Sequence, residues 1–429
     1  MSNEGYLKYI EQGYKPSKTD LVCSFYFEPG RGISKEEAAG AVAAESSTGT
    51  WTELGTIDPK RQVELGAKVF ELKDNYVKIA YPVKLFEPGN MPQIFSSIAG
   101  NIFGMKEVES LRLLDVKWPE KIMHSFKGPQ FGVPGVRKLL KIKERPLCGT
   151  IIKPKLGLNE KEHAKVAYEA WMGGLDIVKD DENLSSQPFN KFYKRVDETL
   201  KLKEKAEKET GEHKVYMCNV THEAKEMLKR AKYLKDQGND YLMVDILTVG
   251  WSALQTLRDE MDKLKLVMHG HRAMHAALTR NKRHGIAMLP LAEAARLIGI
   301  DQLHIGAAVG KMEGSPEEAV MIAEDIENQF IKPKGHIMAE KWGKIKPVFA
   351  VCSGGLYPGA VPKVISLFGK DVIVQAGGGV HGNPLGTRAG AAAMRQVIDA
   401  VMKGIPIKEY AQKHKELKAA VDKWGVLNV

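Results

Sequence analysis

From about residue 145 onward, short apolar runs alternate with helical patterns, and this alternation most constrains the fold. Eight runs fit within roughly 250 residues, which is the size and period of a (β/α)₈, or TIM, barrel. The runs are Gly149–Ile152, Leu175–Val178, Val215–Cys218, Tyr241–Val244, Leu266–Met268, Gln302–Ile305, Val348–Cys352 and Val372–Val374. An open doubly wound sheet is the competing arrangement, but no GxGxxG motif follows the first run.

The residues before the barrel predict a smaller α+β domain of ferredoxin-like type. We expect strands over residues 21–27, 67–72, 77–83 and 111–116, with a hairpin turn at 73–75 and a short helix over 94–98. Ser34-Lys35-Glu36-Glu37 is a capping box that opens an Ala-rich helix toward Glu45. Two prolines among three glycines in residues 128–135 discourage regular structure. We therefore place an N-terminal domain over 1–130 and the barrel, with a helical C-terminal tail, over 131–429.

Composition excludes several classes of protein. The net charge of +10 could indicate nucleic-acid binding, but the basic residues are scattered among glutamates and form no basic arm. A positive field that attracts an anionic small substrate explains the charge instead. No apolar run approaches the roughly 18 residues of a membrane span, and the polar start is unlike a signal peptide. The four cysteines are widely spaced, which predicts buried free thiols in a cytoplasmic protein.

Polar or glycine clusters follow all eight apolar runs, at the end where barrel enzymes keep their active sites. In chain order they begin at Lys153, Lys179, Asn219, Asp245, His269, His304, Ser353 and Gln375. A barrel with a purely structural role would need no such clusters at that face. The sequence therefore predicts an enzyme.

The second cluster, Lys179-Asp180-Asp181-Glu182, predicts a metal site. Residues i and i+2 of a strand share a face, so Lys179 and Asp181 project together and Glu182 can join them where the strand ends. Two adjacent carboxylates attract a hard cation such as Mg²⁺. A lysine ammonium would repel that ion. Lys179 therefore either forms a salt bridge or reacts with CO₂ to become a carbamate, which would supply a third oxygen ligand.

The glycine-rich loops predict a phosphorylated substrate. Loops after the seventh and eighth strands of a barrel commonly bind phosphate, and here they are 353–355 and 377–379. On the opposite side Arg272, His304 and Lys311 could hold a second phosphate. Lys311 lies among small residues in 306–314, as expected of a mobile lid. His269, His271 and His275 could suggest zinc, but without an HExxH motif a proton-transfer histidine fits better.

At this point the chain resembles one family, the large subunit of ribulose-1,5-bisphosphate carboxylase/oxygenase. The resemblance covers both domains and nearly the whole chain. The matching stretches are GTIIKPKLGL (149–158), GGLDIVKDDEN (173–183), HRAMHAALTR (271–280), HIGAAVGKMEG (304–314), SGG (353–355), QAGGG (375–379), AAESSTGTW (43–51) and GNIFG (100–104). The short C-terminus and phrases such as IDQLHIG are similar to archaeal, form III-type enzymes, which need no small subunit.

The resemblance implies roles for individual residues. Carbamylated Lys179 would bind Mg²⁺ with Asp181 and Glu182 and take the C3 proton of ribulose 1,5-bisphosphate. Lys153 would act in acid–base steps at C2, His271 in hydration and cleavage, and Lys311 on the incoming CO₂. The implied catalytic set is completed by Glu45 and Asn101. The implied substrate-binding residues are Thr50, Trp51, Lys155, Arg272, His304, Ser353, Gly354, Gly355, Gln375, Gly377 and Gly378.

The resemblance also implies an assembly. Glu45, Thr50, Trp51 and Asn101 would reach into a partner's site, so the unit is at least a homodimer, which could assemble into larger rings. Cations near Lys179, such as Lys153 and Lys155, would lower the pKa of its amine.

Three departures from plant-type enzymes, Ile151, Ile305 and Ala307, affect the expected discrimination between CO₂ and O₂ more than the reaction. The alternative within the family is an enolase or isomerase of a methylthio sugar phosphate. That kind of protein typically lacks several of the residues found here at positions 45, 101, 153, 271 and 311. A Schiff-base aldolase using Lys153 or Lys179, and a basic nucleic-acid-binding protein, are the other hypotheses.

Overall fold

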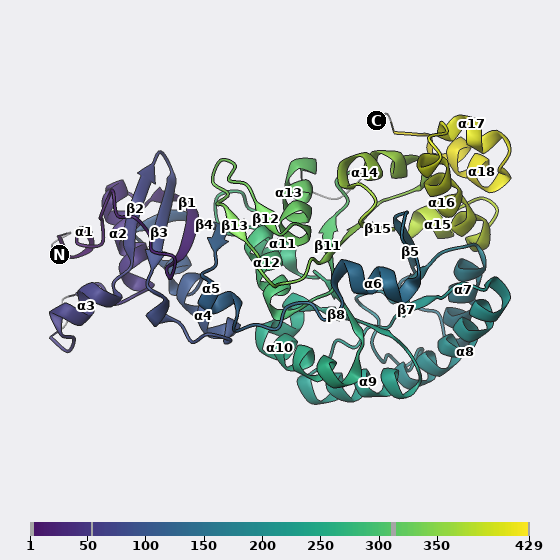
Figure 1. Cartoon of the computed structure of the whole chain (residues 1–429), viewed down its shortest axis with the longest axis horizontal. Coiled ribbons are helices and arrows are strands. Elements are labelled where there is room, and N and C mark those ends of the chain that lie inside the picture. The colour runs from purple at the N-terminus through teal and green to yellow at the C-terminus, as the bar shows by residue number, and fades with distance from the viewer. Residues whose placement is uncertain (1–3, 53–54, 310–314, 428–429) are drawn as a thin grey trace. The chain divides into compact units, whose positions relative to one another are not determined.

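The structure is a computed structural model that describes residues 4–52, 55–309 and 315–427. The chain divides into two compact units, and most of their helices and strands are labelled in Figure 1. The first unit comprises Met1–Gly128, Met274–Ile298 and Asn328–Ile345, and the second comprises Pro129–Ala273, Gly299–Glu327 and Lys346–Val429. The single boundary at 130/131 stays a prediction.

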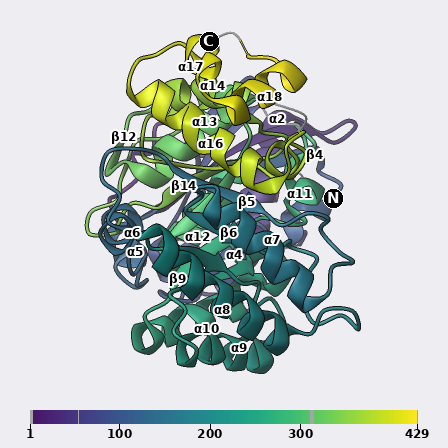
Figure 2. The same cartoon turned by 90° about the vertical axis from the view of Figure 1, so that its right-hand side faces the viewer.

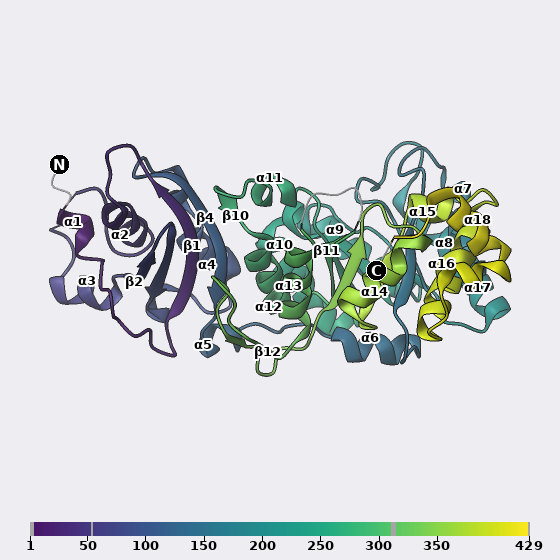
Figure 3. The same ribbon diagram turned by 90° about the horizontal axis from the view of Figure 1, so that it is seen from above.

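The first unit is built on a sheet with strand order β10-β4-β1-β3-β2. Its strands are β1 (Leu21–Pro29), β2 (Lys68–Lys73), β3 (Tyr76–Tyr81), β4 (Val108–Lys117) and β10 (Gly285–Ile286). Strand β1 pairs antiparallel with β3 and β4, and helix α2 (Lys35–Glu45) packs on β1 and β2 (Figure 3). The capping box is confirmed, because Ser34 and Glu37 satisfy each other's backbone N–H groups.

Two details of this unit differ from or complete the sequence expectations. The strand expected over 77–83 ends at Tyr81, because Pro82 cannot donate to a ladder and Val83 begins a 3₁₀ turn. Asp74 takes the left-handed conformation (φ 55°) that the predicted hairpin turn requires. The remaining elements are α1 (Glu4–Leu7), α3 (Pro59–Leu65), 3₁₀ turns (Val83–Leu85, Asn101–Gly104), α4 (Met91–Ile98), α5 (Glu120–Met123), α11 (His275–Thr279), α12 (Met288–Ile298), β12 (Phe330–Ile331) and β13 (Glu340–Lys341).

The second unit contains the predicted barrel. Its parallel strands are β5 (Leu147–Ile151), β6 (Ile177–Lys179), β7 (Val215–Met217), β8 (Tyr241–Asp245), β9 (Val267–His271), β11 (Gln302–Gly306), β14 (Phe349–Ser353) and β15 (Val372–Gln375). Within the described residues the sheet runs β7-β6-β5-β15-β14-β11-β9-β8. The backbone of Met243 closes it between β8 and the end of β7, bonding to Cys218 (2.8 Å) and Val220 (3.0 Å). The barrel and the smaller α+β unit are thereby confirmed.

Helices form the outer layer of the barrel (Figures 1 and 2). They are α7 (Glu160–Met172), α8 (Phe192–Thr210), α9 (Ala224–Asp236), α10 (Ile246–Leu264, kinked at Gly250), α13 (Pro316–Glu327), α14 (Val361–Phe368) and α16 (Thr387–Met402). A 3₁₀ turn (Pro358–Ala360), α15 (Gly378–His381), α17 (Ile407–Gln412) and α18 (Lys415–Trp424) complete the unit. Among the described parts of the chain, no helix is long and apolar enough to cross a membrane. All four cysteines are free and buried.

Helix α6 (Gly132–Leu140) is the clearest correction, because it begins inside the Gly/Pro segment that was expected to be irregular. Pro134 lies in the first turn, where its missing N–H costs nothing. Asp301, just before β11, accepts from the N–H groups of Phe131 (2.6 Å) and Gly132 (2.9 Å). The apolar face of α6 packs with the inward residues of the strands near their N-terminal ends, including Leu147. The opposite ends of the strands are left for chemistry.

His213 forms a pH-dependent clamp between α8 and the start of β8. Its Nδ1 lies 3.0 Å from the Glu207 carboxylate and its Nε2 lies 3.2 Å from that of Asp240. The nearby carboxylates of Asp240 and Glu207 raise the pKa of His213 to about 9 against the effect of burial. Since an unfolded histidine titrates near about 6.5, the stabilisation is complete below that pH and is lost as pH rises through about 9.

The clamp predicts how a His213→Gln variant responds to pH. The parent is expected to have the larger free energy of unfolding at pH 6. The difference between parent and variant should shrink by about 2 kcal/mol between pH 6 and pH 10. Urea titrations of both proteins across that range measure the difference. A difference that stays constant from pH 6 to pH 10 would contradict the clamp.

Candidate active site

Lys179 ends β6, paired with Ile151 of β5 and Met217 of β7, and its side chain is fully buried. The amine donates to the Asp180 carbonyl (2.7 Å) and to the Met243 sulfur (3.2 Å). Burial lowers the pKa of Lys179, while the surrounding carboxylates, Glu182 first, oppose that shift. The sequence analysis attributed a lowered pKa of Lys179 to neighbouring lysines. In the structure the cause is desolvation instead.

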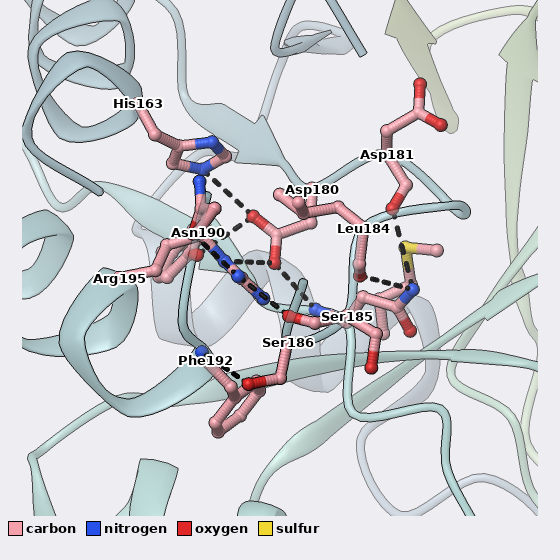
Figure 4. Close-up of polar contacts among 12 residues, drawn as sticks. His163, Asp180, Asp181, Leu184, Ser185, Ser186, Asn190, Phe192 and Arg195 are labelled. Atoms are coloured by element: carbon pink, nitrogen blue, oxygen red, sulfur yellow. Dashed lines mark hydrogen bonds and ion pairs between the residues drawn. The ribbon is translucent and has the colours of Figure 1, made fainter. Parts of the chain in front are cut away.

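Asp181 and Glu182 follow Lys179 and Asp180 in the chain and contact different strand ends. The buried Asp181 places Oδ2 2.7 Å from the Lys153 ammonium, which follows β5. The partly exposed Glu182 places Oε2 3.7 Å from Nε2 of His271 at the end of β9. Asp180, in contrast, turns its carboxylate away from Asp181 (Figure 4). Lys179, Asp181 and Glu182 thus lie at the same end of the strands as Lys153 and His271.

His271 is oriented by Asp245, a residue to which sequence reasoning assigned no role. Nδ1 of His271 lies 2.8 Å from the Asp245 carboxylate, which can only accept, so we assign the ring proton to Nδ1. This leaves Nε2 on the side of Glu182. The sequence could have suggested this pair, because both residues lie at the ends of consecutive predicted strands. In the structure the β8–β9 register places them opposite each other.

His269, His271 and His304 form a group of edge-to-face ring contacts inside the barrel. The ring of His304 lies edge-on to those of His269 (5.0 Å between centroids) and His271 (4.7 Å). Burial, followed by neighbouring charges, holds the pKa values of His269 and His304 well below the ordinary value. Both rings are therefore neutral at pH 7. The buried Nε2 of His304 has no hydrogen-bond partner within the described residues, which suits it to contact a ligand.

Arg272 follows His271, and burial lowers the pKa of its guanidinium to about 10. It fits there because residue 306 is a glycine. A Cβ on Gly306 would lie 2.8 Å from Nη2 of Arg272, and its φ of +110° also excludes most side chains. Lys311, the third residue of this predicted phosphate group, lies outside the described residues with the rest of 310–314.

The loops after β14 and β15 approach each other and Lys153. A Cβ on Gly379 would lie 2.2 Å from the carbonyl oxygen of Leu356, and one on Gly377 would lie 3.0 Å from Cε of Lys153. Only glycine allows this close approach of backbone to backbone. Of the predicted phosphate-binding residues, Ser353 ends β14 and Gly354 and Gly355 follow it, while Gly377 lies between β15 and α15 and Gly378 begins α15.

The remaining predicted residues make other contacts or belong to the first unit. Gln375 turns its amide into the barrel, 3.7 Å from the Met217 sulfur, and the exposed Lys155 donates to Asn183 (3.0 Å). Glu45, Thr50, Trp51 and Asn101 all belong to the first unit. The side chain of Trp51 is 70% exposed, which is unusual for a tryptophan in a folded chain. Their contribution to a partner's site stays a prediction.

Comparison with known proteins adds independent findings. The chain matches the models for the ribulose bisphosphate carboxylase large chain, with the N-terminal domain over residues 8–122 and the catalytic domain over 132–424. It is 50% identical to the ribulose bisphosphate carboxylase of Methanosarcina barkeri, over 97% of this chain and 98% of the relative. It is also 50% identical to that of Pyrococcus abyssi, over 100% and 98%.

Solved structures agree with the sequence comparisons. The dimeric archaeal Rubisco from Hyperthermus butylicus superposes with a TM-score of 0.93 at 46% identity, over 98% of this chain and 100% of that chain. The octameric ribulose-1,5-bisphosphate carboxylase/oxygenase from Pyrococcus horikoshii, in complex with sulfate, gives 0.91 at 48% identity, over 99% and 98%. The chain therefore belongs to the family of ribulose bisphosphate carboxylase large chains.

Proposed function

We propose that this chain catalyses the Mg²⁺-dependent carboxylation of D-ribulose 1,5-bisphosphate. The five-carbon bisphosphate, CO₂ and water give two molecules of 3-phosphoglycerate, and O₂ competes with CO₂ in a side reaction. The observation that carries the proposal is the grouping of two carboxylates, two lysines and the His271–Asp245 pair at one end of the barrel. The names of the relatives support the choice of substrate.

The donor set fits Mg²⁺ once Lys179 carries a carbamate. Within the described residues, no three His, Cys, Asp or Glu side chains are grouped to hold a metal ion. Asp181 and Glu182 supply two oxygen ligands, and a carbamate on Lys179 would supply the third. Burial of this amine favours its neutral form, which is the form that captures CO₂. When bound, Mg²⁺ supplies positive charge beside the oxygens of the reacting carbons.

The proton steps fall to residues around this site. Lys179, in its carbamylated form, takes the proton from C3 of the bisphosphate. Lys153, whose ammonium lies 2.7 Å from Asp181, delivers and removes protons at C2, including the final protonation. His271, with Nδ1 held by Asp245, handles protons at Nε2 during hydration and cleavage of the six-carbon intermediate.

Phosphate binding at both ends would fix the substrate across the barrel mouth. Arg272 and the neutral His304 bind one phosphate, and the glycine loops after β14 and β15 bind the other. Two chains share each site, with Glu45 and Asn101 of one chain completing the site of its partner. The dimeric and octameric neighbours support an oligomeric assembly of this kind.

A labelling experiment tests the proposal. Purified protein given Mg²⁺, labelled CO₂ and ribulose 1,5-bisphosphate is expected to form acid-stable label in 3-phosphoglycerate. Chelation of Mg²⁺ and omission of the bisphosphate are the controls, and each should abolish the label. If no label depends on the bisphosphate while a methylthio sugar phosphate is turned over, the enolase or isomerase alternative is correct instead.

A further inference from the structure

Asp180, the one member of the KDDE run outside the proposed metal site, is the centre of a buried polar network (Figure 4). Its fully buried carboxylate accepts from the Tyr216 hydroxyl (2.8 Å), from Nε of Arg195 (3.2 Å) and from the backbone N–H of Asn219 (3.1 Å). His163 lies 3.1 Å from the same group. The position of Asp180 is thus fixed by groups from α7, α8 and β7.

Two of these partners reach from Asp180 to the turn that carries the metal ligands. The Asn219 amide donates to the carbonyls of Glu182 (3.1 Å) and Leu184 (3.2 Å). Nη1 of Arg195 donates to the carbonyl of Ser185 (2.8 Å) and to the side chain of Asn190 (2.9 Å). The carbonyls of residues 182, 184 and 185 therefore accept from Asn219 and Arg195, and both of these residues also donate to the Asp180 carboxylate.

This arrangement sets the direction of the Asp181 and Glu182 carboxylates and leaves the charge of the site unchanged. Asp181 and Glu182 follow β6 in a turn outside the strand ladder, so the placement of their carboxylates depends on how firmly that turn is held. Asn219 has two amide hydrogens and uses both on that backbone. Without them, the carbonyls of Glu182 and Leu184 lose these donors and the turn can shift.

We propose that Asn219, itself held by Asp180, is a positioning residue for the carboxylates of Asp181 and Glu182. The proposal rests on the metal site of the proposed function. Asn219 touches neither metal nor substrate and acts through the carbonyls of the turn. Loss of such a supporting contact typically weakens metal binding by about 10- to 100-fold.

Asn239 provides a matched control at the other end of the same strands. It is also buried, and its amide donates to two carbonyls, those of Tyr216 (3.0 Å) and Tyr241 (2.6 Å). Both Asn219→Ala and Asn239→Ala therefore remove a buried amide with two carbonyl partners. A merely structural role predicts the same consequences for both variants.

The experiment measures Mn²⁺ affinity by electron paramagnetic resonance in bicarbonate, with Mn²⁺ as the probe for the Mg²⁺ site. We expect Asn219→Ala to bind Mn²⁺ about 10- to 100-fold more weakly than the parent, and Asn239→Ala to match the parent within about twofold. Both variants are expected to lower Tm. Tyr216→Phe, which removes one donor to Asp180, should weaken Mn²⁺ binding by a smaller factor and remains informative if Asn219→Ala fails to fold.

The outcomes separate the positioning role from the proposed function. Parent-like Mn²⁺ affinity in Asn219→Ala overturns the positioning role and leaves the metal site intact. If Asn219→Ala does not fold, parent-like affinity in Tyr216→Phe overturns it. Equal weakening in Asn219→Ala and Asn239→Ala also overturns it, because the effect is then global. A parent protein that binds no Mn²⁺ in bicarbonate overturns the metal site itself and this proposal with it.

Discussion

Replacing Lys179 with methionine is expected to lower the rate of CO₂ incorporation by at least about 1,000-fold, because a metal's charge stabilisation is worth several kcal/mol. Methionine fills the same buried space, but it can neither form a carbamate nor act as a base. The rate is measured as acid-stable label from CO₂ at saturating bisphosphate and Mg²⁺. Mass measurement in bicarbonate should detect the CO₂ adduct on the parent at residue 179 and none on the variant.

Lys214 supplies the control for this substitution. It is another fully buried lysine, placed at the N-terminal end of β7, where it donates to the Leu175 carbonyl (3.2 Å) and pairs with Glu212 (2.7 Å). Lys214→Met should lower Tm and leave the carboxylation rate of the folded protein within about twofold. A Lys179→Met protein that still incorporates CO₂ at the parent rate would exclude residue 179 as the source of base and ligand.

Asp245→Asn is expected to lower the carboxylation rate by about 100- to 10,000-fold with little change in the fold, as amide replacement of a histidine's carboxylate partner does elsewhere. The amide can donate to Nδ1 of His271, which favours the other tautomer and places the ring proton on Nε2. Release of label from C3 of the substrate should fall much less, because that step uses Lys179. Comparing the two rates in one protein identifies the affected step.

Asp236 on α9 is the matched control, since its carboxylate forms an exposed ion pair with Lys232 (2.6 Å). Asp236→Asn should change neither rate by more than about twofold. If Asp245→Asn slows release of C3 label as much as carboxylation, Asp245 acts on the whole site and not through His271.

The barrel was predictable because its evidence is local and repeated. Each strand is a short apolar run that ends in a polar or glycine cluster. The position of that cluster at the end of the run, as with Lys179 and Ser353, predicts a place in the active site. Parallel strands bring those ends to one face, so the cluster from one strand predicts its neighbours. The same reasoning could have paired Asp245 with His271, since adjacent strands carry them.

What the sequence could not supply depends on distant partners. Helix α6 looked irregular because the donors of its first turn are satisfied by Asp301, far along the chain. The lowered pKa of Lys179 comes mainly from burial, which is decided by packing around the whole barrel and not by neighbouring letters. Asp180 and Asp181 are the same residue type, and only the folded structure shows that Asp180 has Arg195 as a partner.

The link between Asp301 and α6 also bears on how the protein is made. Phe131 offers no side-chain cap, so the first N–H groups of α6 gain this carboxylate acceptor only when residue 301 is available. During synthesis, β5 to β9 leave the ribosome before that residue. The first turn of α6 therefore lacks this acceptor until Asp301 has been synthesised, and the contact then links a helix that precedes β5 to the segment that precedes β11.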